Sequence, residues 1–208
     1  ENIVAGAGND TLTGSDADNI LVGGEGDDIL EGLGGDDTLS GGDGSDTASY
    51  ANATGGVTVD LAAQTASGAA GEDTFESIEN VTGSAHADTL SGDDGDNIID
   101  GGVGNDSLIA TEGDDVLRGG SGIDTVDYGN ATGGITADLA AGTVSGLGND
   151  QIQGIENLNG SDYDDTITGG QGNNILSGED GDDILSGGGG NDILLGGAGD
   201  DTLSGGSG

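Results

Sequence analysis

Residues 23–40 read Gly-Gly-Glu-Gly-Asp-Asp-Ile-Leu-Glu followed by Gly-Leu-Gly-Gly-Asp-Asp-Thr-Leu-Ser, and these two nine-residue units contain the pattern that decides the fold. The pattern is Gly-Gly-x-Gly-x-Asp-x-U-x, where U is a large aliphatic residue and the places are numbered 1 to 9. It recurs in three uninterrupted blocks of five units. The units begin at Ala5, Gly14, Gly23, Gly32 and Gly41, at Gly83, Gly92, Gly101, Ala110 and Gly119, and at Gly160, Gly169, Gly178, Gly187 and Gly196.

Two places in the unit carry most of the structural information. Position 6 is Asp in twelve units and Asn in the other three, Asn19, Asn97 and Asn174. Position 8 is aliphatic in every unit, for example Leu30 and Leu108. One aliphatic side chain per nine residues predicts a stacked core made of short strands rather than a globular interior.

The composition is strongly acidic. Asp and Glu together number 41 against one basic residue, Arg118, which gives a formal net charge of -40 on 208 residues. Such a charge excludes nucleic acid as a partner and predicts that the folded state needs counter-ions. Asp outnumbers Glu by 32 to 9, and because the short Asp side chain can bond to its own turn, the acids are expected to have structural positions.

Other residue types exclude further classes of function. The 49 glycines and absence of proline favour repeated tight turns that keep their backbone N–H groups. With no Cys, neither disulfides nor thiolate metal sites can form. No apolar run approaches the ~18 residues of a membrane span, so membrane insertion is not expected. His86 is the only histidine and has no partner for acid–base catalysis or zinc binding, so no enzymatic activity is expected.

Two inserts separate the blocks, at residues 50–82 and 128–159, and they are copies of each other. Both begin with Tyr-x-Asn-Ala-Thr-Gly-Gly, at Tyr50 and Tyr128, and both end with Ile-Glu-Asn. Alternating residues at 57–61 and 135–139 predict strands in what we interpret as wider coils of the same solenoid, with flexible spacers as the alternative. Tyr50 and Tyr128 are expected to pack over block ends, with sugar stacking as a less favoured role.

The organisation predicted is one solenoid, 1–208, with blocks at 5–49, 83–127 and 160–208 and the two inserts between them. Because Glu1-Asn2-Ile3-Val4 matches the end of an insert, the chain is expected to be part of a longer array. No segment shows helical spacing free of Gly, so essentially no α-helix is expected.

The fifteen in-register units resemble the RTX nonapeptide repeats, the hemolysin-type calcium-binding repeats of secreted bacterial proteins. The resemblance implies an all-β fold, a right-handed parallel β-roll or β-helix solenoid, that binds Ca²⁺. Six residues of each unit form a turn and three a strand, so two units make an 18-residue coil. Turns two units apart then lie on the same side, at about the ~4.8 Å strand spacing, where their oxygens can share one Ca²⁺.

The ligand scheme that the resemblance implies joins two such turns. One turn contributes the carbonyls of positions 2 and 4 and the Asp of position 6, and the next same-side turn contributes the carbonyls of positions 1 and 3 and its own Asp. The expected ligands in the first block are Gly6, Gly8, Asp10, Asn19, Gly23, Gly24, Glu25, Gly26, Asp28, Gly32, Gly34, Asp37, Gly41, Asp43 and Asp46. Those in the second are Asp88, Gly95, Asn97, Gly101, Gly102, Val103, Gly104, Asp106, Glu112, Asp115, Gly119, Ser121 and Asp124. Those in the third are Asp165, Gly170, Gly172, Asn174, Gly178, Glu179, Asp180, Gly181, Asp183, Gly187, Gly189, Asp192, Gly196, Ala198 and Asp201.

Five units contain three same-side pairs, so three blocks predict about nine Ca²⁺ ions, and a tenth is expected where Asp192 meets residues 205–207. The pairs of third and fifth units, which begin at Gly23, Gly101 and Gly178, match the motif best. Sites that use the first two units of a block are expected to be weaker, because Ala17, His86 and Tyr163 replace Gly at position 4 and Asn replaces Asp at position 6.

The function expected is that of a calcium-binding repeat region of a larger secreted protein, outside the cell or on the surface of a bacterium. The resemblance implies export by type I secretion and folding on Ca²⁺ outside the cell. Two alternatives remain open, namely the stalk of an adhesin and a carbohydrate-binding module attached to a polysaccharide-modifying enzyme. The expected partners are calcium ions and flanking repeats or domains of the same chain.

Overall fold

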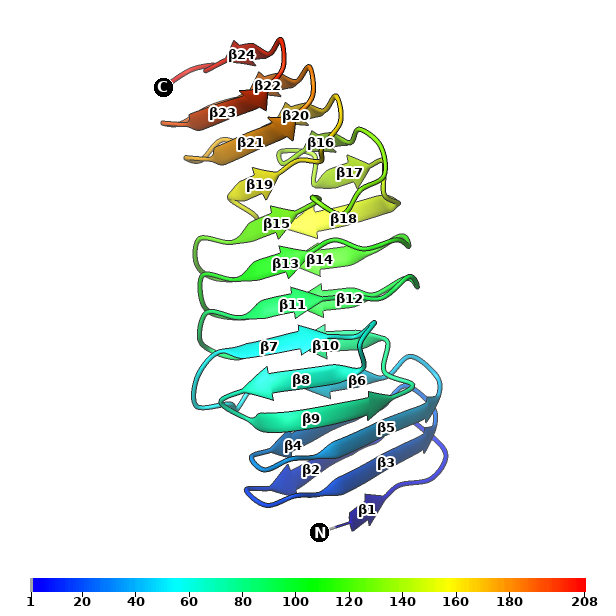
Figure 1. Ribbon diagram of the computed structural model, residues 1–208. Coiled ribbons are helices and arrows are strands. Elements are labelled where there is room, and N and C mark those ends of the chain that lie inside the picture. Colours follow the sequence, from blue (N-terminus) through cyan, green and yellow to red (C-terminus); the bar gives the residue numbers. More distant parts are fainter. Residues whose placement is uncertain (1) are drawn as a thin grey trace.

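The computed structural model describes residues 2–208, and these form two long β-sheets stacked face to face, with the chain ends at opposite ends of the stack (Figure 1). They contain no helix, as predicted, and thus none that could span a membrane. Sheet 1 contains, in spatial order, β1 (Asn2–Val4), β3 (Ile20–Glu25), β5 (Thr38–Asp43), β9 (Gly71–Glu76), β8 (Thr65–Gly68), β7 (Val57–Asp60), β11 (Thr89–Ser91), β13 (Ser107–Ile109), β15 (Thr125–Asp127), β19 (Asn157–Asn159), β21 (Ile175–Asp180) and β23 (Ile193–Ala198). Sheet 2 contains β2 (Thr11–Ser15), β4 (Ile29–Leu33), β6 (Thr47–Ser49), β10 (Asn80–Thr82), β12 (Ile98–Asp100), β14 (Val116–Arg118), β18 (Asn149–Gln153), β17 (Thr143–Ser145), β16 (Thr136–Asp138), β20 (Thr166–Thr168), β22 (Ile184–Ser186) and β24 (Thr202–Ser204).

Within the blocks, neighbouring strands are parallel, and paired residues are 18 positions apart in the sequence, which is one coil. For example, Leu21 pairs with Leu39, and Leu90 pairs with Leu108. This 18-residue register confirms that two units make one coil. The chain alternates between the sheets from one unit to the next, so the turns form two edges of the stack. The architecture is the expected parallel β-roll.

The core is a thin double row of position 8 side chains between the two sheets. Leu21, Leu30 and Leu39 are fully buried, and Leu108 and Leu176 repeat this in the later blocks. The prediction of one buried aliphatic residue per unit holds for thirteen of the fifteen units. The exceptions are Leu194, which is partly buried, and Leu203, which is 47% exposed in the edge strand β24.

The inserts continue the sheets, but the interpretation as wider coils was wrong. Each insert forms a three-stranded antiparallel meander that stands where a block would place one parallel strand. The first, β7–β9, lies in sheet 1, and the second, β16–β18, lies in sheet 2. Antiparallel pairing is possible because short turns at residues 61–64 and 139–142 reverse the chain, which a parallel coil does not do.

Aromatic residues of the inserts are buried in the core between the two sheets. Tyr50 and Tyr128 are 3% and 0% exposed, so their rings pack inside the roll and cannot stack on a sugar. Phe75 is buried opposite Leu39. His86, by contrast, is exposed in its turn.

Candidate metal centres

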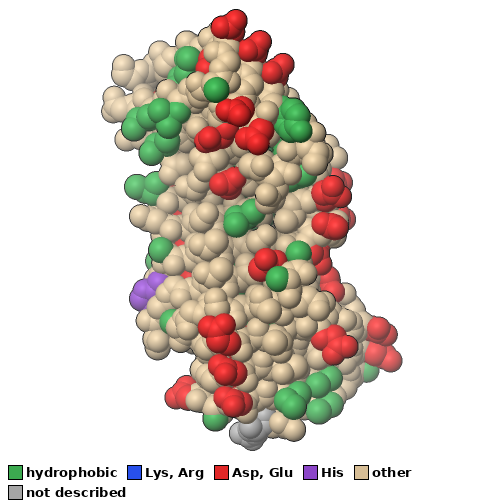
Figure 2. Space-filling view, viewed as in Figure 1, with side chains coloured by type: hydrophobic (Ala, Val, Ile, Leu, Met, Phe, Trp, Pro, Cys, Tyr) green, Lys and Arg blue, Asp and Glu red, His purple; other side chains and the backbone are tan. Residues whose placement is uncertain are grey.

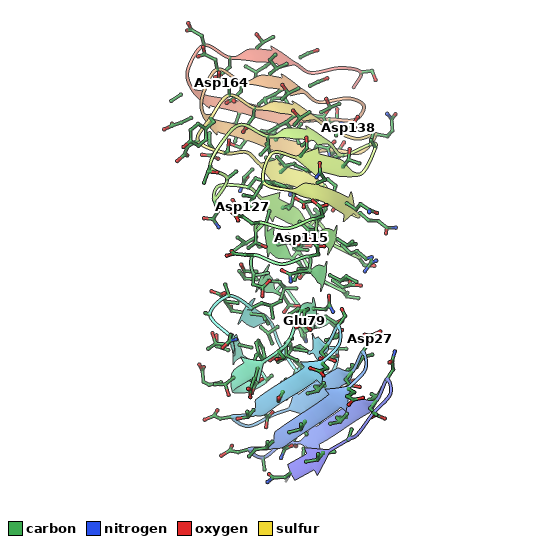
Figure 3. The ribbon with its side chains drawn as sticks, turned by 90° about the vertical axis from the view of Figure 1, so that its right-hand side faces the viewer. Asp27, Glu79, Asp115, Asp127, Asp138 and Asp164 are labelled. Atoms are coloured by element: carbon green, nitrogen blue, oxygen red, sulfur yellow. The ribbon has the colours of Figure 1, made fainter. Side chains whose placement is uncertain are left out.

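The position 6 side chains form a hydrogen-bonded ladder along each edge of the roll. The N–H of Asp10 donates to Asp28 Oδ1 at 2.8 Å, and the N–H of Asp28 donates to Asp46 Oδ1 at 2.7 Å. The same bond joins Asp106 to Asp124 at 2.8 Å. Each carboxylate is therefore held by the turn one coil earlier. Figure 3 shows acidic side chains along the whole length of the solenoid, and the labelled Asp115 is one of the position 6 residues.

The second oxygen of many of these carboxylates is buried and has no hydrogen-bond partner. A carboxylate oxygen withdrawn from water without a partner is strongly destabilising, unless a cation contacts it. All of the affected Asp residues belong to the third, fourth or fifth unit of a block. The unpartnered atoms are the Oδ2 atoms of Asp28, Asp37, Asp46, Asp106, Asp124, Asp183 and Asp192.

Each unpartnered oxygen points at the position 1 glycine of its own turn. A Cβ on Gly101 would lie 2.5 Å from Asp106 Oδ2 and 2.7 Å from the carbonyl oxygen of Gly119, one coil later. Gly23 has the same relation to Asp28 and Gly41. In these units position 1 must therefore lack a side chain, because two oxygens from successive turns converge on that space. Ala5 and Ala110 begin units whose Asp oxygens are not among the unpartnered atoms.

The position 2 and 4 glycines complete the arrangement. Gly102 and Gly104 have φ of +91° and +156°, which disfavours residues with a Cβ. Their carbonyl oxygens lie against Gly120 and Gly122 of the next turn. The position 3 carbonyl of Ser121 faces back and accepts the N–H of Gly104 at 2.9 Å.

The structure brings part of the ligand set expected for a best-matched site together, because Asp106 Oδ2 of one turn and the Gly119 carbonyl of the next converge on one space. The carbonyl of Gly102 accepts the N–H of Ser121 at 2.9 Å, and Asp124 Oδ1 accepts the N–H of Asp106 at 2.8 Å, so these two expected ligands also lie between the two turns. Ca²⁺ takes six to eight oxygen ligands, including carbonyls, in a flexible geometry, so these residues fit a calcium ion. Within residues 2–208, no three Asp, Glu, His or Cys side chains form a metal-binding group by themselves.

The first two units of the blocks are built differently. The Asp88 carboxylate accepts the N–H of Ser84 at 2.6 Å and the Ser84 hydroxyl at 2.9 Å, and Asp165 is bound in the same way by Ser161. In the second units, the Oδ1 atoms of Asn97 and Asn174 accept N–H groups of their own turns. These side chains already have partners, so they are less available to a cation than the carboxylates of the later units.

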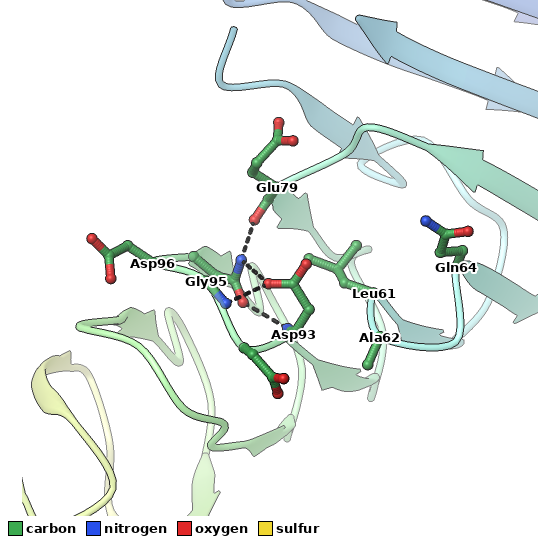
Figure 4. A pocket seen from close by; sticks show the side chains of 9 residues that line it. Leu61, Ala62, Gln64, Glu79, Asp93, Gly95 and Asp96 are labelled. Atoms are coloured by element: carbon green, nitrogen blue, oxygen red, sulfur yellow. Dashed lines mark hydrogen bonds between the residues drawn. The ribbon is translucent and has the colours of Figure 1, made fainter. Parts of the chain in front are cut away.

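Asn97 also shows why an amide stands at this place. Its Nδ2 donates to the carbonyl oxygen of Glu79 at 2.8 Å and to Asp93 Oδ1 at 3.1 Å, around the hollow that Figure 4 shows. Asn174 repeats the bond to the carbonyl of Glu156 at 2.7 Å. A carboxylate has no proton to donate here, so the amide connects each insert to the following block by hydrogen bonds.

Burial changes the acidity of the ladder carboxylates. It raises the pKa of Asp106 to about 6, against the lowering effect of the Asp88 N–H and with added repulsion from Asp88 and Asp124. Burial also raises the pKa of Asp37, Asp46, Asp124 and Asp183. Without a cation, these groups therefore resist ionisation, whereas a bound Ca²⁺ favours the charged form.

Sequence reasoning missed a second ladder at position 5, on the outer side of the turns. Asp27 Oδ1 accepts the N–H of Ser45 at 3.0 Å, and Asp164 Oδ1 accepts that of Asp182 at 2.9 Å. These bonds point from one coil to the next, whereas the position 6 bonds point to the coil before. The signal was available, since position 5 is Asp or Asn in twelve of the fifteen units.

It also missed the acids of the inserts. Asp73 Oδ1 accepts the N–H of Asp37 at 2.9 Å and thus occupies a position 6 place, and its Oδ2 accepts the hydroxyl of Tyr50 at 2.9 Å. Asp150 and Tyr128 form the same pair at 2.8 Å. Residues 68–76 and 145–153 are therefore degenerate units, in which a tyrosine hydroxyl contacts the oxygen left unpartnered elsewhere.

Stacked turns in which main-chain and aspartate oxygens converge are the features of a calcium-binding repeat protein. The family model for the RTX calcium-binding nonapeptide repeat (4 copies) matches residues 1–30, 13–48, 73–108, 100–131, 152–185, 159–194 and 177–208. These matches cover well over half of the chain, which therefore belongs to this family and is a calcium-binding repeat protein of the type found in secreted bacterial proteins. The family's repeats have a structural, calcium-binding role. No curated protein matches the chain.

Proposed function

We propose that this chain is a calcium-switched folding segment of a larger secreted protein, without order when Ca²⁺ is scarce and rigid when it is plentiful. The single observation that carries the proposal is the set of unpartnered, buried Asp Oδ2 atoms. The turns hold these oxygens together at a cost in free energy that a divalent ion removes. Export of the unfolded chain by a type I system, followed by folding outside the cell, accords with this behaviour.

The weakness of the apolar core supports the proposal. Ordering the backbone of one residue costs ~1–2 kcal/mol, whereas one buried Leu contributes only ~1.5–3 kcal/mol for nine residues. Acidic side chains lie along the whole length of the face in Figure 2, so self-repulsion also opposes folding. Each Ca²⁺ site filled a hundredfold above its dissociation constant adds ~2.7 kcal/mol.

We propose about nine interior sites and a tenth at Asp192. A site binds Ca²⁺ more tightly where its Asp oxygens have no hydrogen-bond partner. The pairs of third and fifth units, represented by Asp28, Asp106 and Asp183, bind most tightly. The pairs that begin with Asp88 and Asp165 bind Ca²⁺ more weakly, because Ser84 and Ser161 already donate hydrogen bonds to those carboxylates.

Circular dichroism during a calcium titration, with magnesium as the control, tests the proposal. We expect a cooperative gain of β signal with Ca²⁺ and little with Mg²⁺, which requires compact octahedral geometry and gives up its water reluctantly. A chain that is already β-rich in excess chelator, or that responds equally to both ions, contradicts the calcium switch.

A further inference from the structure

The last turn of the first block does not face another nonapeptide turn. It faces residues 77–79 of the first insert, where the N–H of Asp46 donates to Glu79 Oε2 at 2.8 Å. Asp46 is 0% exposed, and its Oδ2 has no partner. Glu79 thus occupies the place that the next position 6 Asp takes inside a block.

The space around Gly41 repeats the arrangement found within the blocks. A Cβ on Gly41 would contact both Asp46 Oδ2 and the carbonyl oxygen of Ser77. At Gly23, the same space receives Asp28 Oδ2 and the carbonyl of Gly41. The Ser77 carbonyl therefore takes the position of the position 1 carbonyl of a following turn.

The insert makes this turn with fewer residues. Val81 pairs with Ala48 and Ile99 as a position 8 residue, which makes Glu79 position 6. Only Ser77 and Ile78 separate it from β9, where a regular unit has five turn residues. Ser77 has φ of +51°, and Glu is one methylene longer than Asp, so a shorter turn still places a carbonyl and a carboxylate against Asp46.

The second insert builds the same arrangement independently. The N–H of Asp124 donates to Glu156 Oε2 at 2.9 Å, and Asp124 is 0% exposed with an unpartnered Oδ2. The carbonyl oxygen of Gly154, whose φ is +65°, converges with Asp124 Oδ2 on the space beside Gly119. Two copies in different sheets of the stack present the same set of oxygens.

We propose that each insert completes an additional calcium site with the last turn of the block before it. The first joins Asp46 and the carbonyls of Gly42 and Gly44 to the Ser77 carbonyl and Glu79. The second joins Asp124 and the carbonyls of Gly120 and Gly122 to the Gly154 carbonyl and Glu156. These sites add two ions to those within the blocks, and the inference rests on the calcium binding proposed above.

Such a site connects a block to its insert through a metal ion, and Glu79 connects that insert to the next block. In Figure 4 the carboxylate of Glu79 points away from the hollow, and its main-chain oxygen is bonded within it. That oxygen accepts the Asn97 amide of the second block. A single residue therefore joins a metal-bound edge of one block to a hydrogen-bonded edge of the next.

The test is the number of tightly bound calcium ions per full-length chain, measured by elemental analysis after equilibrium with a calcium buffer. We expect the double variant E79Q/E156Q to bind two ions fewer than the native chain, since Gln keeps an acceptor for the Asp46 and Asp124 N–H groups but loses the charge. The control E72Q/E76Q removes two charges from exposed side chains of the first insert and should retain the native number.

The outcomes separate the two proposals. A native chain that binds no calcium overturns the proposed function, whereas native calcium binding with an unchanged number in E79Q/E156Q overturns only the insert sites. If the variant fails to fold, anomalous diffraction from the calcium-loaded native chain decides. An ion ~2.3–2.6 Å from the carbonyl oxygens of Ser77 and Gly154 supports the inference, and ordered turns without such an ion refute it.

Discussion

The substitution Asp106→Asn tests whether Asp106 is a metal ligand or an ordinary buried acid. Asp106 is 2% exposed, its Oδ1 accepts the Asp88 N–H at 2.9 Å, and its Oδ2 has no partner. Asn retains an acceptor for the Asp88 N–H and nearly the same volume. The variant therefore preserves the ladder and removes the charge directed at the metal.

The expected loss follows from the number of sites that share Asp106. One filled site contributes ~2.7 kcal/mol at a hundredfold excess over its dissociation constant, and loss of both adjoining sites gives about twice that value. The free energy of unfolding in saturating calcium should fall by this amount. With a urea m-value on the order of 2–3 kcal/mol/M, the midpoint of unfolding moves down by about 2 M.

Asp60→Asn is the matched control because it removes the same charge from a half-buried acid outside the ladders. Asp60 Oδ1 accepts the N–H of Ala63 at 2.8 Å in the turn after β7, a bond that Asn can also make. Its effect should stay within about 0.5 kcal/mol. Equal losses for the two variants in calcium would refute the ligand role of Asp106.

Two further predictions concern pH and the inserts. The pKa of Asp106 in the folded state is about 6, above the value of ~3.9 for an Asp in an unfolded chain. Between these two pKa values the metal-free folded state binds more protons than the unfolded chain, so the stability of the folded state falls as pH rises. Acidification from pH 7 to about 5 in chelator should therefore increase the β signal in circular dichroism. In the presence of calcium, the concentration of Ca²⁺ at half-folding should rise over the same pH range, because protons compete with the ion. A loss of β signal in the chelated sample on acidification would contradict the predicted direction. Tyr128→Phe leaves Asp150 Oδ2 buried without its hydroxyl partner and should reduce the free energy of unfolding in saturating calcium by about 1–3 kcal/mol. Tyr163→Phe, at a residue 48% exposed, is the control for urea unfolding and should change little, and equal midpoints for the two variants would contradict a role for the Tyr128 hydroxyl.

The strictly periodic parts of the fold could be predicted from the sequence. Leu30 and Leu108 at position 8 had to share one interior, because a period of nine gives each coil two equivalent strands. Asp28 and Asp106 recur at position 6 of their units, and the preference for Asp over Glu indicated that such acids have structural positions. Both predictions depend only on local repetition, so they needed no knowledge of the distant chain.

The inserts could not be predicted in the same way. Alternation at residues 57–61 indicates a strand, but it contains no information on the direction of the neighbouring strand. Counting by nine also missed Glu79, because the shortened turn places this position 6 residue six residues after Asp73 instead of nine. The outer ladder escaped notice because Asp27 and its equivalents are exposed, and exposed acids ordinarily indicate only a solvated surface.

The placement of the two meanders in opposite sheets affects the direction of the whole rod. Each meander lengthens one side of the stack by two strands, which is about 10 Å at ~4.8 Å per strand. Unequal sides tilt the long axis toward the shorter side, and the second insert, on the other sheet, tilts it back. A chain with an even number of alternating inserts thus keeps one overall heading, whereas an odd number leaves a bend, so the insert count sets where distant parts of such a protein point.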